Sequence, residues 1–149
     1  IGANLADVNM TGATLRDAKF IGSNLRTAKM LGVSASRASF TTTVLSLADL
    51  SGADLSAANL SSVNATRANF GRANLEGAIL TNANLSEARF DRTRLTEARL
   101  NGANLSGANL STTIGLSQRQ LARACGDQAT ILPPDLAIAP CARRETPQP

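Results

Sequence analysis

Along most of the chain an apolar residue returns at every fifth position. From Leu5 to Leu110, each position divisible by five holds Leu, Met or Phe, apart from Ala35 and Ala65. Five residues advance an α-helix by about 500°, and on a β-strand consecutive fifth residues point to opposite faces. Neither element alone buries all of these side chains on one side. The period therefore predicts a chain that turns once per repeat and returns each apolar residue to a common axis.

The other positions of the repeat have their own pattern. Two residues before each apolar centre lies Ala, Val, Ser or Thr, and the remaining three positions are mostly polar or Gly. The 22 repeats contain no insertion or deletion. Phe20 and Phe40 are 20 residues apart, as are Phe70 and Phe90. This second spacing favours a 20-residue coil in which the paired rings stack.

These repeats resemble the pentapeptide-repeat proteins, whose consensus is A(D/N)LXX. The stretches GANLSGANLS, GADLSAANLS and RANLEGAIL match it closely, and the resemblance covers about three quarters of the chain. It implies an all-β fold, a right-handed quadrilateral β-helix with four repeats per coil and about 5.5 coils over residues 1–112. Centre and minus-two side chains then point inward. The outward Asn4, Asn24, Asn64, Asn84 and Asn104 share one column, and we expect them to form a ladder bonded from coil to coil.

After Leu110 the five-residue register ends, so a different structure is expected over residues 113–142. Ser117 and Gln120 have the spacing of a capping box, which predicts a short helix over residues 118–125. An extended apolar flap is expected to follow, carrying Ile131, Leu132, Leu136 and Ile138. Because a solenoid needs its ends covered, we expect helix and flap to close the last coil. The stretch resembles a terminal module of some bacterial pentapeptide-repeat proteins.

The two ends of the chain carry weaker signals. Residues 143–149 contain two prolines and no apolar pattern, and we expect a disordered tail. The chain opens in mid-repeat without Met, so we expect the native N-terminus to have been removed or left out.

Both cysteines, Cys125 and Cys141, lie in the region after the repeats. A disulfide between them would add about 3 kcal/mol by closing a loop, and would place the protein in an oxidising compartment, in a bacterium the periplasm or exterior. The alternative is a pair of reduced thiols in a small core, compatible with the cytoplasm. Without His or a CxxC pair the sequence does not predict a metal site, and no cofactor is expected.

The composition also argues against catalysis and membrane insertion. The chain contains no His, so its many Ser and Thr residues lack the commonest general base. Asp49 and Asp54 fall on adjacent sides of the coil and do not form a catalytic pair. No apolar run approaches the roughly 18 residues of a membrane span. We therefore expect a protein that is not an enzyme and has no transmembrane segment.

Function is expected on the outer faces. The candidate partner surface combines outward aliphatic residues with arginines: Leu31, Val44, Leu47, Arg67, Arg72, Arg89, Arg92, Arg94 and Arg99. Arg72 and Arg92 should be column neighbours, with Arg89, Arg94 and Arg99 nearby and Arg67 round the corner. Glu87, Asp91 and Glu97 are interleaved with them. Solvated ion pairs and scattered exposed aliphatics are the alternative interpretation of these positions.

Two function classes follow. The first is a scaffold that binds another protein, for instance as an accessory or stabilising subunit of a larger complex, a membrane-associated one included. The second comes from a subgroup of the similar family that mimics DNA and occupies gyrase. Such mimicry needs an acidic surface, whereas the repeats hold 11 Lys and Arg against 8 Asp and Glu, and the whole chain carries a net charge of +4. Without Tyr or Trp to stack on bases, specific nucleic-acid binding is not expected either. The sequence does not indicate an oligomeric state.

Overall fold

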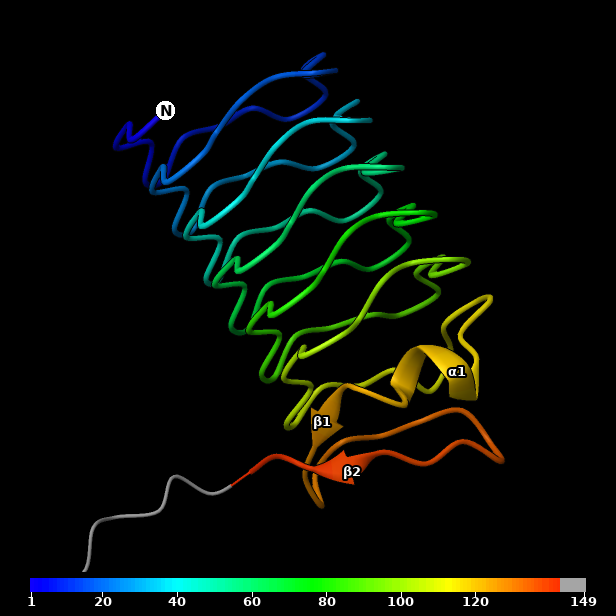
Figure 1. The fold of residues 1–149 in the computed structure, drawn as a ribbon. Coiled ribbons are helices and arrows are strands. Elements are labelled where there is room, and N and C mark those ends of the chain that lie inside the picture. The colour runs from blue at the N-terminus through cyan, green and yellow to red at the C-terminus, as the bar shows by residue number, and fades with distance from the viewer. Residues whose placement is uncertain (143–149) are drawn as a thin grey trace, which may run out of the picture.

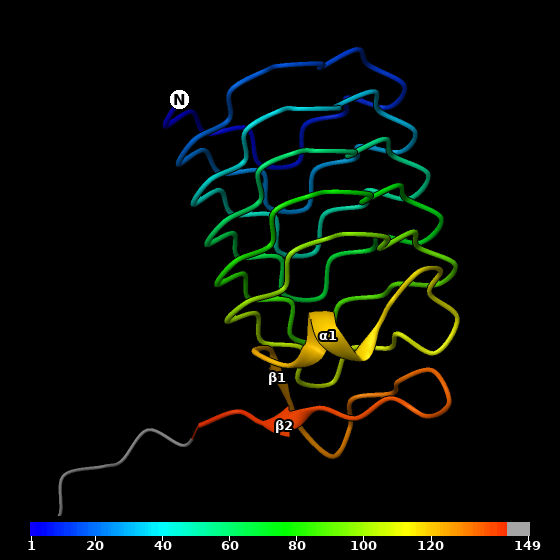
Figure 2. The ribbon, with the colours of Figure 1, turned by 45° about the vertical axis from the view of Figure 1, so that its right-hand side comes forward.

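The computed structural model describes residues 1–142 and is dominated by parallel β-bridges between residues 20 apart. Asn4 pairs with Asn24, and the next bridge residues along the first coil pair in the same way. Four columns of bridges run along the rod, beginning at Asn4, Asn9, Thr14 and Lys19, and we call them its first, second, third and fourth sides. Figures 1 and 2 show the coils stacked from the N-terminus toward the later residues.

The interior of the rod is filled by the centre and minus-two residues of the repeats. From Leu25 to Leu110 every centre is almost fully buried, including the small Ala35 and Ala65. The Phe20 and Phe40 rings lie 5.1 Å apart at their centroids, and those of Phe70 and Phe90 lie 5.3 Å apart. Both pairs are nearly coplanar stacks, which confirms the stacking predicted from their 20-residue spacing.

Two-residue corners join one side to the next. The second corner residue has a left-handed backbone, as at Gly12 (φ 71°) and Arg72 (φ 58°). A backbone hydrogen bond closes each corner, for example from Ala13 N–H to Met10 C=O at 2.9 Å. Gly adopts this conformation without steric cost, whereas other residues strain slightly.

The predicted asparagine ladder is largely wrong. Within residues 1–142 one such contact joins Asn24 Nδ2 to Asn4 Oδ1, at 3.3 Å. The later members of this column instead accept from their own corner, as Asn84 Oδ1 does from Ser86 N–H at 3.1 Å. An Asn or Asp side chain reaches the backbone two residues on without help from another coil. The hydrogen bond within each corner therefore forms in place of a side-chain bond between coils.

The chain ends in a segment of mixed structure, residues 113–142. Helix α1 spans Gln118–Leu121, and two short parallel strands follow, β1 (Cys125–Gly126) and β2 (Ala139–Pro140). The predicted helix over residues 118–125 is therefore too long. Cys125 is bound into the coil beneath it, since its N–H donates to Ala103 C=O at 3.0 Å and its C=O accepts from Leu105 N–H at 2.8 Å. Those ladder bonds replace the last helical turn.

The bridge register also continues past Leu110, contrary to our expectation. Ile114 still pairs 20 residues back, with Arg94, whereas Cys125 pairs with Asn104 and Ile131 with Asn109. The sequence separation of paired residues grows by one residue after α1, because α1 takes the place of a fourth-side bridge. It grows by another residue after the turn that begins at Asp127. Ile131 is thus a bridge residue, 51% exposed, rather than part of the apolar flap.

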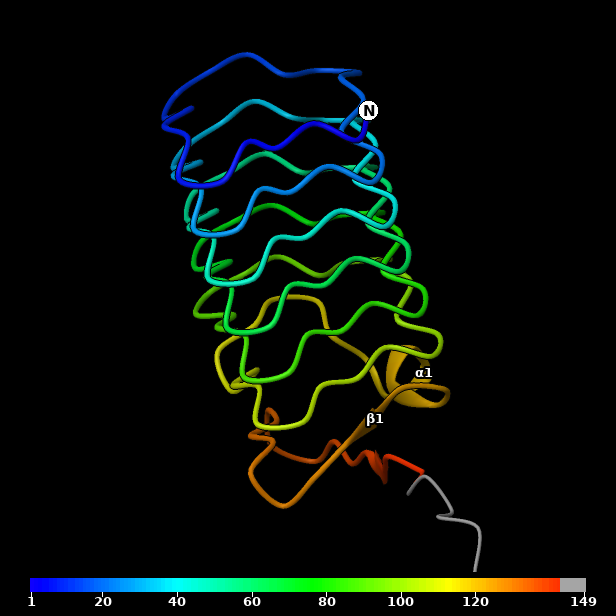
Figure 3. The ribbon, with the colours of Figure 1, turned by 90° about the vertical axis from the view of Figure 1, so that its left-hand side faces the viewer.

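The rest of the flap covers the last coil, as Figures 1 and 3 allow the reader to follow. Leu132, Leu136 and Ile138 are partly buried against the core, and Leu121 of α1 joins it. A disulfide links Cys125 to Cys141, with 4.6 Å between their Cα atoms. The predicted tail, residues 143–149, lies outside the described residues.

Candidate interaction surface

The second side and its two corners hold most of the candidate partner residues. Its bridge column includes Arg89. The corner between the first and second sides carries Leu47 and, one coil further on, Arg67. The corner between the second and third sides carries Leu31, Arg72 and Arg92. The 20-residue register produces this grouping, because residues 20 apart stack in neighbouring coils. The exposed fractions of Leu31 and Leu47 are 38% and 43%.

Three candidates lie elsewhere. Val44 sits on the first side, between Asn24 and Asn64, and is half-buried. Arg94 is a bridge residue of the third side and Arg99 of the fourth. The structure therefore does not bring all nine candidates onto one face.

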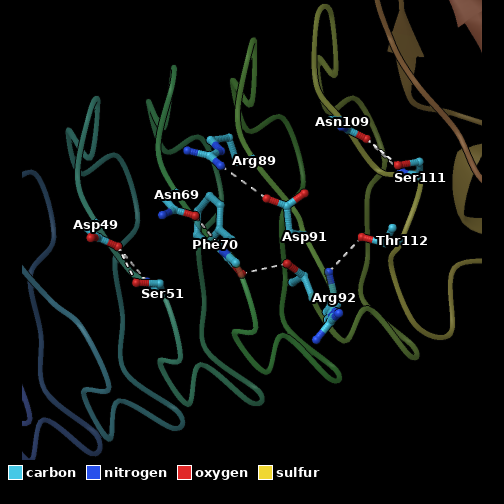
Figure 4. Close-up of polar contacts among 12 residues, drawn as sticks. Asp49, Ser51, Asn69, Phe70, Arg89, Asp91, Arg92, Asn109, Ser111 and Thr112 are labelled. Atoms are coloured by element: carbon cyan, nitrogen blue, oxygen red, sulfur yellow. Dashed lines mark hydrogen bonds and ion pairs between the residues drawn. The ribbon is translucent and has the colours of Figure 1, made fainter.

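A hollow of about 410 Å³ opens on the second side and its corner with the third. We call it the arginine hollow; it is lined by Ser51, Asn69, Gly71, Arg72, Arg89, Asp91 and Arg92. Figure 4 shows Asn69 and Arg89 on neighbouring coils, with Asp91 and Arg92 at the corner beside them. Three guanidinium groups thus surround one concave surface.

The arginine hollow is open at its floor because Gly71 has no side chain to fill it. Its column positions one coil away on either side hold Ser51 and Asp91, so the missing side chain leaves a gap between two occupied places. A Cβ at Gly71 would lie 3.0 Å from Asn69 Oδ1, which already accepts from the Gly71 N–H at 2.9 Å. This gap has a signal in the sequence, because Gly71 is the one Gly among the first corner residues of the repeats.

Polar side chains around the hollow are held by their own corners. Asp49 Oδ1 accepts from the Ser51 N–H at 3.0 Å, and Asn109 Oδ1 accepts from the Ser111 N–H at 3.1 Å (Figure 4). The backbone N–H of Arg92 donates to Thr112 Oγ1 at 3.0 Å. The last of these bonds holds the backbone that carries Arg92.

The arginines themselves differ in how far they are neutralised. Arg67 forms an ion pair with Glu87 at 2.9 Å, and Arg89 approaches Asp91 at 3.5 Å. Among the described residues, the Arg72 and Arg92 side chains form neither a hydrogen bond nor an ion pair. Two exposed cations on neighbouring coils are therefore available to an anionic group.

A second hollow, of about 740 Å³, was not anticipated. It lies in the terminal segment, where the turn after Gly126 faces Ile138 and Cys141, with Ser106 at its edge. The exposed Asp127 carboxylate accepts from the Gly107 N–H at 2.9 Å, and this backbone hydrogen bond lowers the pKa of Asp127. The hollow forms because the flap folds back against the turn after Gly126. No local sequence motif predicts this fold-back.

Residues 1–142 contain neither a cluster of metal-binding side chains nor a helix that could span a membrane. Clusters of three or more His, Cys, Asp or Glu that would hold a metal ion do not occur in this part of the chain. Within the same residues, no helix has both the length and the apolar character to cross a bilayer.

Comparison with known proteins identifies the repeats. A family model described as pentapeptide repeats matches eight copies, over residues 1–32, 31–61, 43–82, 58–96 and 80–111. A search of curated protein sequences found no match.

Solved structures provide similar chains. A pentapeptide repeat protein from the thylakoid lumen of Arabidopsis thaliana is 32% identical, with 87% of this chain and 81% of that one covered and a TM-score of 0.55. HetL, a pentapeptide repeat protein involved in heterocyst differentiation regulation in the cyanobacterium Nostoc, is 26% identical, with coverages of 87% and 70% and a TM-score of 0.50. The repeats, their bridges and these likenesses agree on a right-handed β-helical solenoid, and the chain belongs to the pentapeptide repeat family.

Proposed function

We propose that this protein is a non-enzymatic scaffold that binds another protein through its second side, with the arginine hollow as the contact centre. The observation that carries the proposal is the pair of uncompensated guanidinium groups, Arg72 and Arg92, around a floor left open by Gly71. Guanidinium groups bind carboxylates through paired hydrogen bonds. The partner is therefore a protein that presents an acidic segment.

Apolar residues beside the hollow support the same surface. Leu31 and Leu47 are exposed at the two corners that border the second side. Arginine is enriched where proteins associate, and exposed aliphatic residues beside it add apolar contact area to the same surface. A solvated charge mosaic needs neither the hollow nor the aliphatic corners.

The corner chemistry supplies a clean variant for testing the proposal. Arg72 and Arg92 stand in a column whose earlier members are Gly12, Gly32 and Gly52, all with left-handed backbones. Replacing both arginines by Gly therefore removes two charges and relieves backbone strain instead of adding it. The matched control is the pair Arg94→Asn and Arg99→Asn, which removes the same charge from the third and fourth sides.

The experiment is isolation of the protein from its native cells in mild detergent, with identification of what migrates with it. We expect a stoichiometric partner that is lost with Arg72→Gly/Arg92→Gly and retained with the control pair. A partner retained by both variants would exclude the arginine hollow. The absence of any co-migrating protein would exclude the accessory-subunit role.

A second variant probes shape rather than charge. Gly71→Ser places in the hollow the residue found at positions 51 and 111, where Ser Oγ donates to the preceding Asp or Asn at 2.6 and 2.7 Å. Stability should change little because the local bond can form. Partner affinity should fall about tenfold, the effect of losing a good central contact. Unchanged affinity would mean that the partner does not enter the hollow.

We extend the proposal to architecture and location. The solenoid occupies residues 1–112 as about 5.5 quadrilateral coils, and residues 113–142 act as its cap. The Cys125–Cys141 disulfide and the thylakoid-lumen origin of one similar protein favour a location outside the cytoplasm. Alkylation of the thiols in intact cells tests this: two freely alkylated cysteines would contradict it. The basic charge balance argues against a DNA mimic.

A further inference from the structure

A second group of arginines gathers on the fourth side of the rod, across the tube from the second side and its arginine hollow. A depression of about 480 Å³ opens there beside α1, and we call it the fourth-side hollow. Its volume lies in the range typical of small-ligand sites. Its polar lining residues are Glu97, Arg99, Asn101, Arg119, Gln120 and Arg123.

This hollow forms because α1 replaces the bridge that would follow Arg99. Among residues 1–142, Arg99 is the last bridge residue of the fourth side. Gln120 holds α1 against the coil beneath, because its Nε2 donates to the C=O groups of Leu95 and Ala98. Figures 2 and 3 show α1 at the end of the stack of coils. Arg119 is therefore held beside Arg99.

Arg123 is placed at the other end of the hollow by the next corner. Its C=O accepts from the Gly102 N–H at 2.7 Å, a ladder bond between neighbouring coils. This bond brings Arg123 next to Asn101, which precedes Gly102 at the same corner. Two segments far from each other in structure type, a coil and the terminal cap, thus supply the arginines of one concave surface.

The guanidinium groups of the fourth-side hollow are not neutralised by the protein. Within residues 1–142, the side chains of Arg99, Arg119 and Arg123 are exposed and form neither a hydrogen bond nor an ion pair. Glu97 has no ion pair in this part of the chain either. Three positive groups and one negative group give the lining a net charge of +2.

The backbone adds an open donor to this surface. Asn59, in the same bridge column as Arg99, accepts through Oδ1 from the Ser61 N–H at 3.0 Å. An arginine side chain has no acceptor atom, so the equivalent Asn101 N–H has no partner within residues 1–142. A ligand oxygen can take the place that Oδ1 occupies at Asn59.

These donors and charges fit one class of ligand. Guanidinium groups bind phosphate oxygens through paired hydrogen bonds, and backbone N–H groups bind them as well. A phosphate monoester carries a charge of about −1.5 to −2 at pH 7, which balances the lining. We propose that the fourth-side hollow binds a phosphate monoester group, carried by a soluble molecule or by a lipid headgroup.

The binding test is titration calorimetry of the whole chain with glycerol 3-phosphate. We expect saturable binding, and about tenfold weaker binding of dimethyl phosphate, a diester with a single negative charge. The absence of saturable binding would overturn the proposal. Equal affinity for the monoester and the diester would also overturn it, because the hollow would then attract anions without selecting the monoester.

Two arginines of the cap locate the binding. Arg119→Gln/Arg123→Gln should weaken glycerol 3-phosphate binding by about tenfold or more, because charge-assisted hydrogen bonds are lost. The matched control is Arg16→Gln/Arg26→Gln, which removes the same charge from the first two coils and should leave binding unchanged. Equal weakening by both pairs, or by neither, would place the effect outside the hollow and overturn the proposal.

A third variant closes the open backbone donor. Arg99→Asn places at this position the residue that the column has at Asn59, so the new Oδ1 can accept from the Asn101 N–H while the fold is kept. Binding should weaken about tenfold, and the melting temperature should not fall. Unchanged binding would separate the ligand from Arg99 and Asn101 and would overturn the proposal.

Vesicles distinguish the two sources of the phosphate group. Co-sedimentation with phosphatidylcholine vesicles that contain phosphatidic acid, reversed by glycerol 3-phosphate, would identify a lipid headgroup. Binding of glycerol 3-phosphate without co-sedimentation would identify a soluble phosphate monoester. Binding to neither probe would overturn the proposal and would leave the protein-binding role of the second side untouched, because the two hollows share no lining residue.

Discussion

The two ends of the rod use the same repeat but are finished in different ways. At the N-terminal end the backbone groups of Asn4 and its equivalents have no partner among residues 1–142, and Leu5 is partly exposed. At the other end the column member Leu105 is fully buried, and its N–H donates to Cys125 C=O at 2.8 Å. Among residues 1–142, the last coil is covered by residues 113–142, whereas no described residue covers the first coil.

The comparison teaches that closing a β-helix takes polar side chains as well as apolar cover. Gln120 Nε2 donates to Leu95 C=O at 2.6 Å and to Ala98 C=O at 2.9 Å. Thr130 Oγ1 donates to Leu105 C=O at 2.9 Å. The Leu95 and Leu105 carbonyls also accept from the corner N–H groups of Ala98 and Ala108, at 3.0 Å each. Ala98 C=O has no backbone donor within residues 1–142, and a buried carbonyl without a partner is costly. The first coil has no equivalent arrangement.

The largest expected difference between the ends comes from one column of leucines. Leu105→Ala should lower the free energy of unfolding by about 3–4 kcal/mol, because a buried cavity is left behind. Leu5→Ala should cost about 1 kcal/mol, because its side chain is already partly in water. Denaturant unfolding measures both. Equal costs would mean that the two ends are covered alike.

Next in size is the disulfide at the closed end. Replacing Cys125 and Cys141 together by Ser should cost about 2–3 kcal/mol, since the bond closes a loop with a sequence separation of 16 in the unfolded chain. Thermal unfolding of the double variant and of the reduced native chain, each compared with the oxidised chain, measures the effect. If both melt like the oxidised chain, the terminal segment does not depend on its disulfide.

A smaller loss is expected when the polar closure is removed. Gln120→Ala should cost about 2 kcal/mol, because the carbonyls of Leu95 and Ala98 lose a donor. Gln128→Ala, at an exposed position of the same segment, is the control and should change stability little. Amide hydrogen exchange should locate the loss in α1 and the coil beneath it. Uniformly faster exchange along the rod would contradict a local role.

The smallest predicted effect is on acid stability. The Gly107 N–H lowers the pKa of Asp127, and the side-chain hydrogen bond from Arg37 lowers that of Asp17. A carboxyl group with a lowered pKa stabilises the fold above its ordinary pKa, about 3.9, and loses that contribution as pH falls through the lowered value. Asp127→Asn should therefore flatten the decline in melting temperature below about pH 4. An unchanged dependence of melting temperature on pH would mean that the Asp127 carboxylate does not help to hold the terminal segment on the last coil.

Regular parts of this protein were predictable from single positions. The spacing of Phe20 and Phe40 gave the coil length because stacking partners must be one coil apart, and the structure confirms both ring stacks. Ser117 and Gln120 located the start of α1, where Gln120 Oε1 accepts from the Ser117 N–H at 2.8 Å. A fixed repeat length determines the first feature, and local helix geometry determines the second.

Features that depend on competition between bonds were not predictable in this way. The capping pattern does not reveal that ladder bonds to Ala103 and Leu105 claim Cys125 and shorten the helix. Proximity in the sequence predicts that Arg94 and Arg99 lie near Arg89, yet five residues move the chain to the next side of the rod. The arginine hollow depends on an absent side chain at Gly71, which a search for charged residues overlooks.

The closed end also limits how far such molecules can assemble. A β-helix with two free edges is a monomer unit for polymerisation, since every added copy exposes a fresh edge. Here Cys125 and Ile131 occupy the bridge positions that a following molecule would need, and the chain of β1 and β2 lies beyond them. Growth by stacking stops at that end.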